Sequence, residues 1–505
     1  MGKRFVAVAL AALLLGGACS GDDDDSASEA AGATREPAPA ITGPAAFTTN
    51  GSINAAWVTD ADPGTALMLV DGEGMKVAQQ SADDAGSAIF YDVAPGDGYT
   101  VRETESDEVL GSDEFAVLEP GATPKATLYD QPLEPGLNYV KMRDGVELAM
   151  TLRLPTGKTM DDAPFATVIE YSGYQVAAPH DLLNDVASRL GDPDLPADPL
   201  VPSTSTAVGS LIAPAIGFAT VSVQMRGTGC SGGAFDLFDY PTVYDGYDAV
   251  ETVATQDWVK GGKVGMVGIS FSGMTQLFTG GTQPPHLAAV APLSVTDDLY
   301  RTVGSPGGIY NKGFAQSWLE ERTEDAKPAP EGGQPWAKEL VAQGDEHCIA
   351  NQKLHSQARD VFEILSENPE RVPELYDHRA PAKWGADIDV PIFMASAFQD
   401  EQIVGVGPRL VSGLEDNPNV YITLMNGTHV DPLGPGTITR WAEFLGLFVG
   451  DEAITIPDTV LTLGGALYQQ IASAAAAPVE QSRFAGRTDV DAVKQEYRQD
   501  PRVRV

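Results

Sequence analysis

The sequence predicts a doubly wound α/β domain with a helical cap insertion, preceded by a small all-β sandwich domain. Apolar and partly β-branched runs at 166–169, 218–223 and 264–269 are nearly continuous, as expected of parallel strands buried on both faces. Between the last two runs, apolar residues recur at helical spacing over 247–258, which indicates an amphipathic helix. Before residue 131 the chain instead shows short strand-like runs between turn signals, which is typical of a sandwich.

Changes in composition divide the 505 residues into several segments, because a chain of this length exceeds one compact domain. We expect a signal peptide at 1–19, a disordered tether at 20–45, a β-sandwich module at 46–130, the first part of the α/β domain at 131–300, a helical cap at 301–385, the second part of the α/β domain at 386–450, and a linker with the start of a truncated C-terminal β domain at 451–505.

The charge balance is strongly acidic, with 71 Asp and Glu against 32 Lys and Arg and a net charge of −39. A field of this sign repels nucleic acid phosphates and anionic lipid headgroups, so neither is an expected partner.

The N-terminus has the features of an export signal. Lys3 and Arg4 precede an apolar run at 5–15, which is followed by small residues and Cys19. The run is too short for a transmembrane helix, and no other stretch approaches the roughly 20 apolar residues that one requires. The segment resembles a bacterial lipoprotein signal, which implies lipidation of Cys19 and an anchor on the outer face of the cell membrane. Cleavage followed by secretion is the alternative.

The module at 46–130 contains five strand-like runs separated by Asp, Pro and Gly turns. We expect strands at 52–58, 65–70, 87–93, 99–103 and 115–118. No cluster of His, Cys or aromatic residues marks a site there, so a spacer is the first interpretation and substrate or cell-wall binding the second.

The α/β domain begins with a hairpin whose turn is Asp144-Gly145, after which apolar and polar residues alternate to Leu154. Two further buried strands are expected at 392–395 and 420–425, followed by a helix at 438–448. The intervening cap shows helical patterns at 313–321, 335–342 and 348–365.

The stretch at 264–273 predicts a strand, a sharp turn with Ser270 at its tip, and a helix. This arrangement is a nucleophile elbow, in which a strained turn lifts the serine hydroxyl clear of the sheet. Ser272 stands where the usual G-x-S-x-G pattern has its second glycine. A tight strand-to-helix connection without catalytic function is the alternative interpretation.

A serine hydrolase of this architecture needs an acid and then a histidine, each beyond the carboxyl end of a strand. Asp400 follows the run at 392–395, and His429, one of only six histidines, follows the run at 420–425. Glu401 and Asp431 are the rival acids. We therefore expect Ser270 as nucleophile, His429 as base and then acid, and Asp400 as the group that orients the imidazole.

The tetrahedral oxyanion requires hydrogen-bond donors, and the first expected donor is the amide of Phe271. No metal-binding, phosphate-binding or dinucleotide-binding motif is present, so no cofactor and no metal are expected.

Four motifs, in order along about 135–450, resemble the Xaa-Pro dipeptidyl-peptidase and cocaine esterase family. They are Met-Arg-Asp-Gly-Val-Glu-Leu-Ala at 142–149, Glu-Tyr-Ser-Gly-Tyr at 170–174, Met-Arg-Gly-Thr-Gly-Cys-Ser-Gly-Gly at 225–233, and the elbow at 264–273. The resemblance implies an α/β-hydrolase with a helical cap, an elbow of the form found here, and Tyr174 as a second oxyanion donor. It also implies a C-terminal jelly-roll domain, which is missing from this sequence.

Export would place Cys230 and Cys348 in an oxidising compartment. One disulfide between them and two buried free thiols are both compatible with the sequence.

The expected function is cleavage of an acyl bond in a small peptide or ester through an acyl-enzyme, most closely like an Xaa-Pro dipeptidyl-peptidase. A carboxylesterase or amino-acid ester hydrolase is the first alternative. A dipeptidyl-peptidase must bind a free α-ammonium, for which Asp297 and Asp298 are candidate partners, although a capping pair on an exposed turn explains them equally well. A non-catalytic surface adhesion protein with a decayed hydrolase domain is the alternative from another class.

Overall fold

The structure is a computed structural model that describes residues 36–104, 108–192, 195–203, 206–472 and 477–505. The expected signal peptide with Cys19, and the first part of the expected tether, lie outside the described residues. Residues Pro37–Val505 form one compact unit that includes both the β module and the α/β domain. Among the described residues, no helix is both long enough and apolar enough to cross a membrane.

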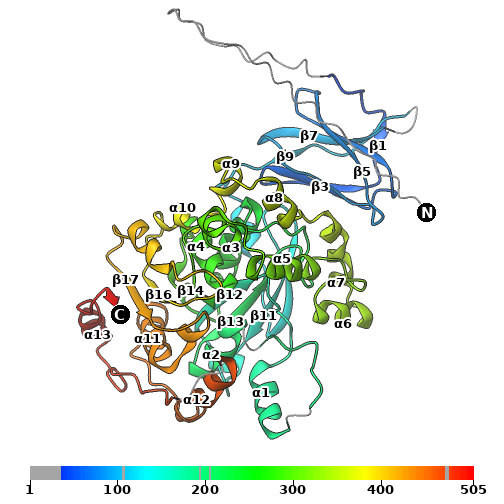
Figure 1. Ribbon diagram of the computed structural model, residues 1–505. Helices are drawn as coiled ribbons and strands as arrows, with labels where there is room; N and C mark the ends of the chain where they lie inside the picture. Colours follow the sequence, from blue (N-terminus) through cyan, green and yellow to red (C-terminus); the bar gives the residue numbers. More distant parts are fainter. Residues whose placement is uncertain (1–35, 105–107, 193–194, 204–205, 473–476) are drawn as a thin grey trace, which may run out of the picture. The chain divides into compact units, whose positions relative to one another are not determined.

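Within the described chain, the α/β domain is built on a nine-stranded sheet in the order β10-β11-β13-β12-β14-β15-β16-β17-β18 (Figure 1). Strands β10, β11 and β13 pair antiparallel, and all neighbours from β13 onward pair parallel. The bounds are β10 Gly136–Lys141, β11 Glu147–Arg153, β12 Phe165–Ser172, β13 Ala219–Gln224, β14 Val259–Ile269, β15 Leu287–Leu293, β16 Ile392–Ala397, β17 Val420–Met425 and β18 Val503–Arg504.

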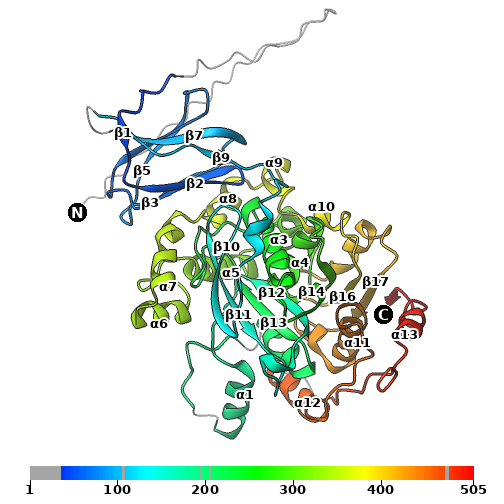
Figure 2. The same ribbon diagram turned by 180° about the vertical axis from the view of Figure 1, so that it is seen from behind.

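Neighbouring residues of the central strands enter two different hydrophobic cores, because successive side chains of a strand point to opposite faces. Ile169 packs in the core that contains Val250 and Phe278, whereas Val168 packs in the core with Trp441. Helices α3 (Tyr240–Ala254) and α4 (Phe271–Gly281) therefore cover one face (Figure 1). Helices α2 (Val208–Ile212) and α11 (Pro435–Leu445) cover the other face; α2 is labelled in Figure 1 and α11 in both views (Figure 2).

The insertion between β15 and β16 is helical, as expected for the cap. Its α-helices are α5 Phe314–Asp325, α6 Pro335–Gln343, α7 Glu346–Asn351, α8 Val361–Glu367, α9 Pro373–Tyr376 and α10 Pro381–Gly385. The single helix expected at 348–365 is wrong, because α7, a 3₁₀ segment η6 (Gln352–Gln357) and α8 replace it. Asp345 caps α7 through the amide of Cys348, and Asp360 caps α8, so each helix has its own start signal.

The N-terminal module contains two sheets around a core that includes Val58, Leu69 and Val101. Its strands are β1 Gly43–Pro44, β2 Thr48–Ser52, β3 Ala55–Thr59, β4 Ala66–Val70, β5 Lys76–Ser81, β6 Ala88–Phe90, β7 Gly96–Glu103, β8 Leu110–Gly111 and β9 Phe115–Val117. The single strand expected at 52–58 is wrong: Asn54 has a φ of 52° and turns the chain between β2 and β3. Strand β5 was not expected, since its sequence Lys-Val-Ala-Gln-Gln-Ser is mostly polar.

The segment at 451–505 differs from the expected linker and start of a separate β domain. It forms α12 (Asp458–Ala472) and α13 (Val490–Tyr497), and β18 then adds to the main sheet beside β17 (Figure 1). Phe484 and Tyr497 are buried in the core that also holds Tyr421 of β17. These described residues therefore belong to the α/β domain, because they bury apolar side chains against it.

Candidate active site

Ser270 occupies the sharp turn between β14 and α4, with φ 60° and ψ −119°. Glycine is required on both sides of this turn. A Cβ at Gly268, which has a φ of 142°, would lie 2.4 Å from Cβ of Ser272, and a Cβ at Gly273 would lie 2.7 Å from the carbonyl oxygen of Leu293. The close approach that needs the second glycine is therefore at residue 273 rather than 272. This explains why serine replaces glycine at 272 in the usual G-x-S-x-G pattern.

The imidazole of His429 lies in the loop after β17 and is paired with Asp400, which follows β16. Its Nδ1 is 2.7 Å from Oδ2 of Asp400, and both residues are buried. The other carboxylate oxygen of Asp400 accepts hydrogen bonds from the amides of Gln402 and Ile403, each at 2.9 Å. Nε2 of His429 is also buried, and no described residue is its hydrogen-bond partner. This nitrogen is therefore the one available to a nucleophile or substrate.

The carboxyl end of β15 fixes the serine turn and the histidine loop to adjacent residues. The amide of Ser270 donates to the carbonyl of Leu293 at 2.9 Å, and the hydroxyl of Ser294 donates to the carbonyl of His429 at 2.6 Å. Since Leu293 and Ser294 are consecutive, the backbones of the expected nucleophile and the expected base are held at the same end of the sheet.

The two rival acids have other partners. Glu401 accepts a hydrogen bond from the backbone amide of His429 at 3.0 Å. Asp431 accepts hydrogen bonds from Thr428 and from the hydroxyl of Tyr468. Asp400 is thus the acid that these contacts place on the imidazole.

Tyr174 follows β12 and packs against Phe271, the residue after Ser270. Its ring makes an edge-to-face contact with Phe271, with centroids 5.4 Å apart. The intervening Gly173 allows this approach, because a Cβ there would lie 2.5 Å from the Phe271 ring. Phe271 is the first residue of α4, and the first amides of a helix have no acceptor within the helix. The two expected oxyanion donors therefore come from residues whose rings pack together, and one of these residues directly follows Ser270.

Two side chains of α5 in the insertion also contact Tyr174. The indole nitrogen of Trp318 donates to the Tyr174 hydroxyl at 3.1 Å, and the Arg322 guanidinium lies 4.9 Å from the ring centroid. The sequence analysis missed these residues, and it also missed Ser294. A helix was expected at 313–321, but nothing in its sequence identifies the face that meets the site.

A disulfide joins Cys230 and Cys348 across 118 residues of sequence. Cys230 lies in the glycine-rich loop after β13, and Cys348 lies in α7 of the insertion. The bond therefore ties the insertion covalently to the α/β domain.

Of the acidic pair considered for an α-ammonium, Asp298 is already paired with cations. Asp298 accepts from Arg371 at 2.7 Å and contacts Arg301 at 3.4 Å. Asp297 accepts from the hydroxyl of Thr296 at 3.2 Å. Two guanidinium groups compensate the Asp298 carboxylate, which therefore does not attract a substrate cation as a free carboxylate would.

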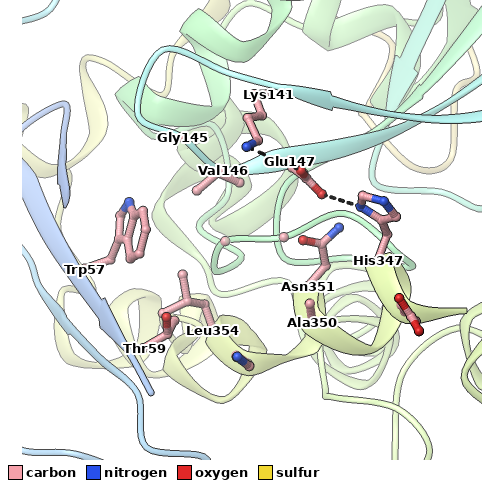
Figure 3. A pocket seen from close by; sticks show the side chains of 14 residues that line it. Trp57, Thr59, Lys141, Gly145, Val146, Glu147, His347, Ala350, Asn351 and Leu354 are labelled. Carbon is pink, nitrogen blue, oxygen red and sulfur yellow. Dashed lines mark hydrogen bonds and ion pairs between the residues drawn. The ribbon is translucent and has the colours of Figure 1, made fainter. Parts of the chain in front are cut away.

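A separate cleft of about 420 Å³ lies between the β module and the α/β domain (Figure 3). Trp57 lines it from β3, and on the other side Glu147 pairs with His347 at 2.9 Å. Lys141 lies 4.0 Å from Glu147. Ser270, Asp400 and His429 are not among the residues that line this cleft.

In a comparison with known families, residues 144–431 match the family described as X-Pro dipeptidyl-peptidase (S15 family). The match covers more than half of the chain and includes the elbow, the acid and the histidine.

Two curated relatives, from Mycobacterium bovis and Mycobacterium tuberculosis, each carry the name "putative serine esterase". Each is 29% identical over 181 residues, which is 36% of this chain and 27% of the relative. The match thus spans about a quarter of the relatives' length.

Among solved structures, a CocE/NonD family hydrolase from Staphylococcus aureus is 19% identical, with a TM-score of 0.46, covering 66% of this chain and 56% of its own. An aminopeptidase from a marine sediment Thaumarchaeota archaeon is 18% identical, with a TM-score of 0.45, covering 70% of this chain and 59% of its own.

Proposed function

The chain belongs to the X-Pro dipeptidyl-peptidase (S15) family, and we propose that it is a serine hydrolase that cleaves an acyl bond through an acyl-enzyme. The observation that carries the proposal is the buried pair of His429 and Asp400, held at the same end of the sheet as the strained turn at Ser270. A serine hydroxyl is a weak nucleophile until a base takes its proton, and this pair supplies an oriented base.

In the proposed reaction, Oγ of Ser270 attacks the substrate carbonyl while Nε2 of His429 takes the hydroxyl proton. Asp400 accepts the hydrogen bond from Nδ1 and stabilises the imidazolium. The Phe271 amide and the Tyr174 hydroxyl donate to the oxyanion. His429 then protonates the leaving group, and water attacks the resulting acyl-enzyme by the same sequence of proton transfers.

Small peptides with proline at the second position and small esters are the two candidate substrates. Family membership favours the peptides. The ion pairs of Asp298 with Arg371 and Arg301 remove one of the two candidate carboxylates for a substrate ammonium, which favours the esters. The names of the two mycobacterial relatives agree with this second candidate.

The test uses the neighbouring serines of the elbow as a matched pair. Ser270→Ala is expected to abolish labelling by a fluorophosphonate probe and to lower turnover of aryl esters and Xaa-Pro anilides by about 10⁴–10⁶. Ser272→Ala keeps the Cβ packed against Gly268 and removes a hydroxyl without a described partner, so labelling should persist. Wild-type protein that resists the probe would contradict the proposal and favour a non-catalytic binding protein. The ratio of ester to anilide turnover distinguishes the two substrate classes.

We also propose that the chain is exported and anchored to the outer face of the cell membrane by lipid on Cys19. The support is the sequence pattern of a basic start, an apolar run and a cysteine after small residues. Cys19→Ser in the producing cell should abolish incorporation of radiolabelled palmitate and move the protein from the detergent phase to the aqueous phase. A wild-type protein that takes up no label would contradict lipidation.

A further inference from the structure

Helix α5 places two side chains, one turn apart, on the Tyr174 ring and hydroxyl. Trp318 and Arg322 are separated by four residues and therefore lie on the same face of the helix. The indole nitrogen of Trp318 is 3.1 Å from the Tyr174 hydroxyl, and the Arg322 guanidinium is 4.9 Å from the ring centroid. Both residues come from the insertion, whereas Tyr174 follows the central strand β12.

The contact with Trp318 determines which way the phenol can donate. An indole N–H is a donor and cannot accept, so the Tyr174 hydroxyl must be the acceptor in this hydrogen bond. The hydroxyl proton of Tyr174 then points away from Trp318 and is free for a second acceptor. The edge-to-face contact with Phe271 fixes the ring, and only 9% of Tyr174 is exposed.

Arg322 adds a positive charge above the same ring. Its side chain is only 10% exposed and is held by Asp325 at 3.0 Å and Glu321 at 3.3 Å. A cation over an aromatic face is attracted to the ring, and the attraction grows as negative charge develops on the phenol oxygen. That charge develops when the phenol shares its proton with an oxyanion.

We propose that Trp318 and Arg322 are positioning residues of the oxyanion site, acting through the hydroxyl of Tyr174. This inference rests on the proposed function. When Ser270 attacks, the carbonyl electron pair moves to oxygen, and the Tyr174 O–H donates a hydrogen bond to that oxygen without giving up its proton. The indole aims the donor before substrate arrives, so the insertion completes a site whose nucleophile and base belong to the sheet.

A double-mutant cycle tests whether Trp318 acts through the tyrosine hydroxyl. Trp318→Phe keeps an aromatic ring and removes the N–H, and it should lower kcat for an aryl ester about 5- to 10-fold with KM little changed. In a Tyr174→Phe background, which itself should lose about 10²–10³ in kcat, the same substitution should cause no further loss. Equal losses in the two backgrounds would overturn the inference.

The control for Trp318 is Trp384, another tryptophan of the insertion. Its indole nitrogen donates to the backbone carbonyl of His378 at 2.9 Å rather than to Tyr174. Trp384→Phe should therefore leave kcat unchanged. A comparable loss in this variant would assign the effect to general loosening of the insertion and would overturn the inference.

Arg322 is tested by charge removal and rescue. Arg322→Met keeps the length of the side chain and should lower kcat about 5-fold, while Arg322→Lys restores part of the loss because a cation remains near the ring. The matched control is Arg359→Met, since Arg359 lies 4.4 Å over the ring of Tyr91 in the β module. An Arg322→Lys variant no better than Arg322→Met would overturn the role of the charge.

A spectroscopic measurement separates this inference from the proposed function. In ¹⁵N-labelled protein the chain has six indole N–H signals, and the one lost in Trp318→Phe belongs to Trp318. Tyr174→Phe should shift that signal and not the signal of Trp384. A shift of the Trp318 signal together with a non-additive cycle supports the inference, whereas an unmoved signal overturns it. Absence of fluorophosphonate labelling on Ser270 would instead overturn the proposed function and the catalytic role derived from it.

Discussion

The side chain of Asp400 is aligned before it meets the histidine. Two backbone amides, from Gln402 and Ile403, occupy one carboxylate oxygen, so the other oxygen remains for Nδ1 of His429. Because Nδ1 then carries the proton, Nε2 is the basic nitrogen.

Asp400→Asn should therefore lower kcat by roughly 10³–10⁴ with little change in KM, since an amide can donate to Nδ1 and reverse the tautomer. Steady-state kinetics with an aryl ester measure this. Glu401→Gln is the control, because Glu401 accepts a hydrogen bond from the backbone amide of His429, whereas the imidazole is paired with Asp400. A larger loss in the Glu401 variant would show that the acid is misassigned.

Glu170 is a buried residue of β12 whose carboxyl group reaches α2. It accepts hydrogen bonds from the amides of Gly209 and Ser210, each at 3.0 Å. Burial nevertheless dominates and raises the pKa of Glu170 from 4.5 to about 7. The folded protein thus binds this proton more tightly than the unfolded chain does.

The sign of the pH dependence follows from this raised pKa. The stability that protonated Glu170 contributes is fully present below pH 4.5 and is lost as the pH rises through about 7. The free energy of unfolding of wild type relative to Glu170→Gln should therefore fall by on the order of 2–3 kcal/mol across this interval. Urea unfolding of both proteins at several pH values measures the difference. A difference that rises with pH would contradict the assignment.

At the scale of elements, the insertion depends on one covalent link as well as on packing. The disulfide between Cys230 and Cys348 closes a loop of 118 residues, which restricts the unfolded chain. The same bond holds α7 against the loop after β13.

Cys230→Ala/Cys348→Ala should lower the free energy of unfolding by on the order of 2–4 kcal/mol. Thermal unfolding with and without reductant checks this. Reductant should destabilise wild type and leave the double variant unchanged. Equal sensitivity of both proteins to reductant would exclude the disulfide as the cause.

At the scale of the whole molecule, the β module shares a buried charged group with the α/β domain. The hydroxyl of Ser52 donates to Oδ2 of Asp144 at 2.5 Å, and Asn50 and Trp57 donate to the Asp144 carbonyl. Arg226 bridges Asp144 and Asp245. Burial opposes ionisation of Asp144, but Arg226 and these hydrogen bonds outweigh it and lower its pKa.

Ser52→Ala should therefore destabilise the whole protein by about 1–3 kcal/mol, because it removes a hydrogen bond to a buried carboxylate. Thr49→Ala is the control, since its hydroxyl bonds the carbonyl of Trp57 within the module. Calorimetry should show one cooperative transition that Ser52→Ala shifts. Two transitions, with the one from the α/β domain unmoved, would show that the module is an independent spacer.

Local patterns predicted much of the fold. Buried strands such as β17 and amphipathic helices such as α3 have a periodicity that depends only on neighbouring residues. The prediction failed where the residue pattern is weak or the partner is distant. Polar β5 pairs with its neighbour β4, and the run at 52–58 folds back at Asn54. Strand β18 pairs with β17, which lies far from it in sequence.

Sequence alone was enough to predict the type of each proposed catalytic group and its place on the chain. The order of Ser270, Asp400 and His429 after three strand-like runs is enough, because parallel strands end at the same edge of a sheet. The contacts between these groups became visible only in the folded protein. It brings Asp400 rather than Asp431 to the imidazole and places Trp318, 144 residues away in sequence, on the hydroxyl of Tyr174. Hydrogen bonds and charge contacts extend only a few ångströms, so they depend on packing between distant segments that periodicity does not encode.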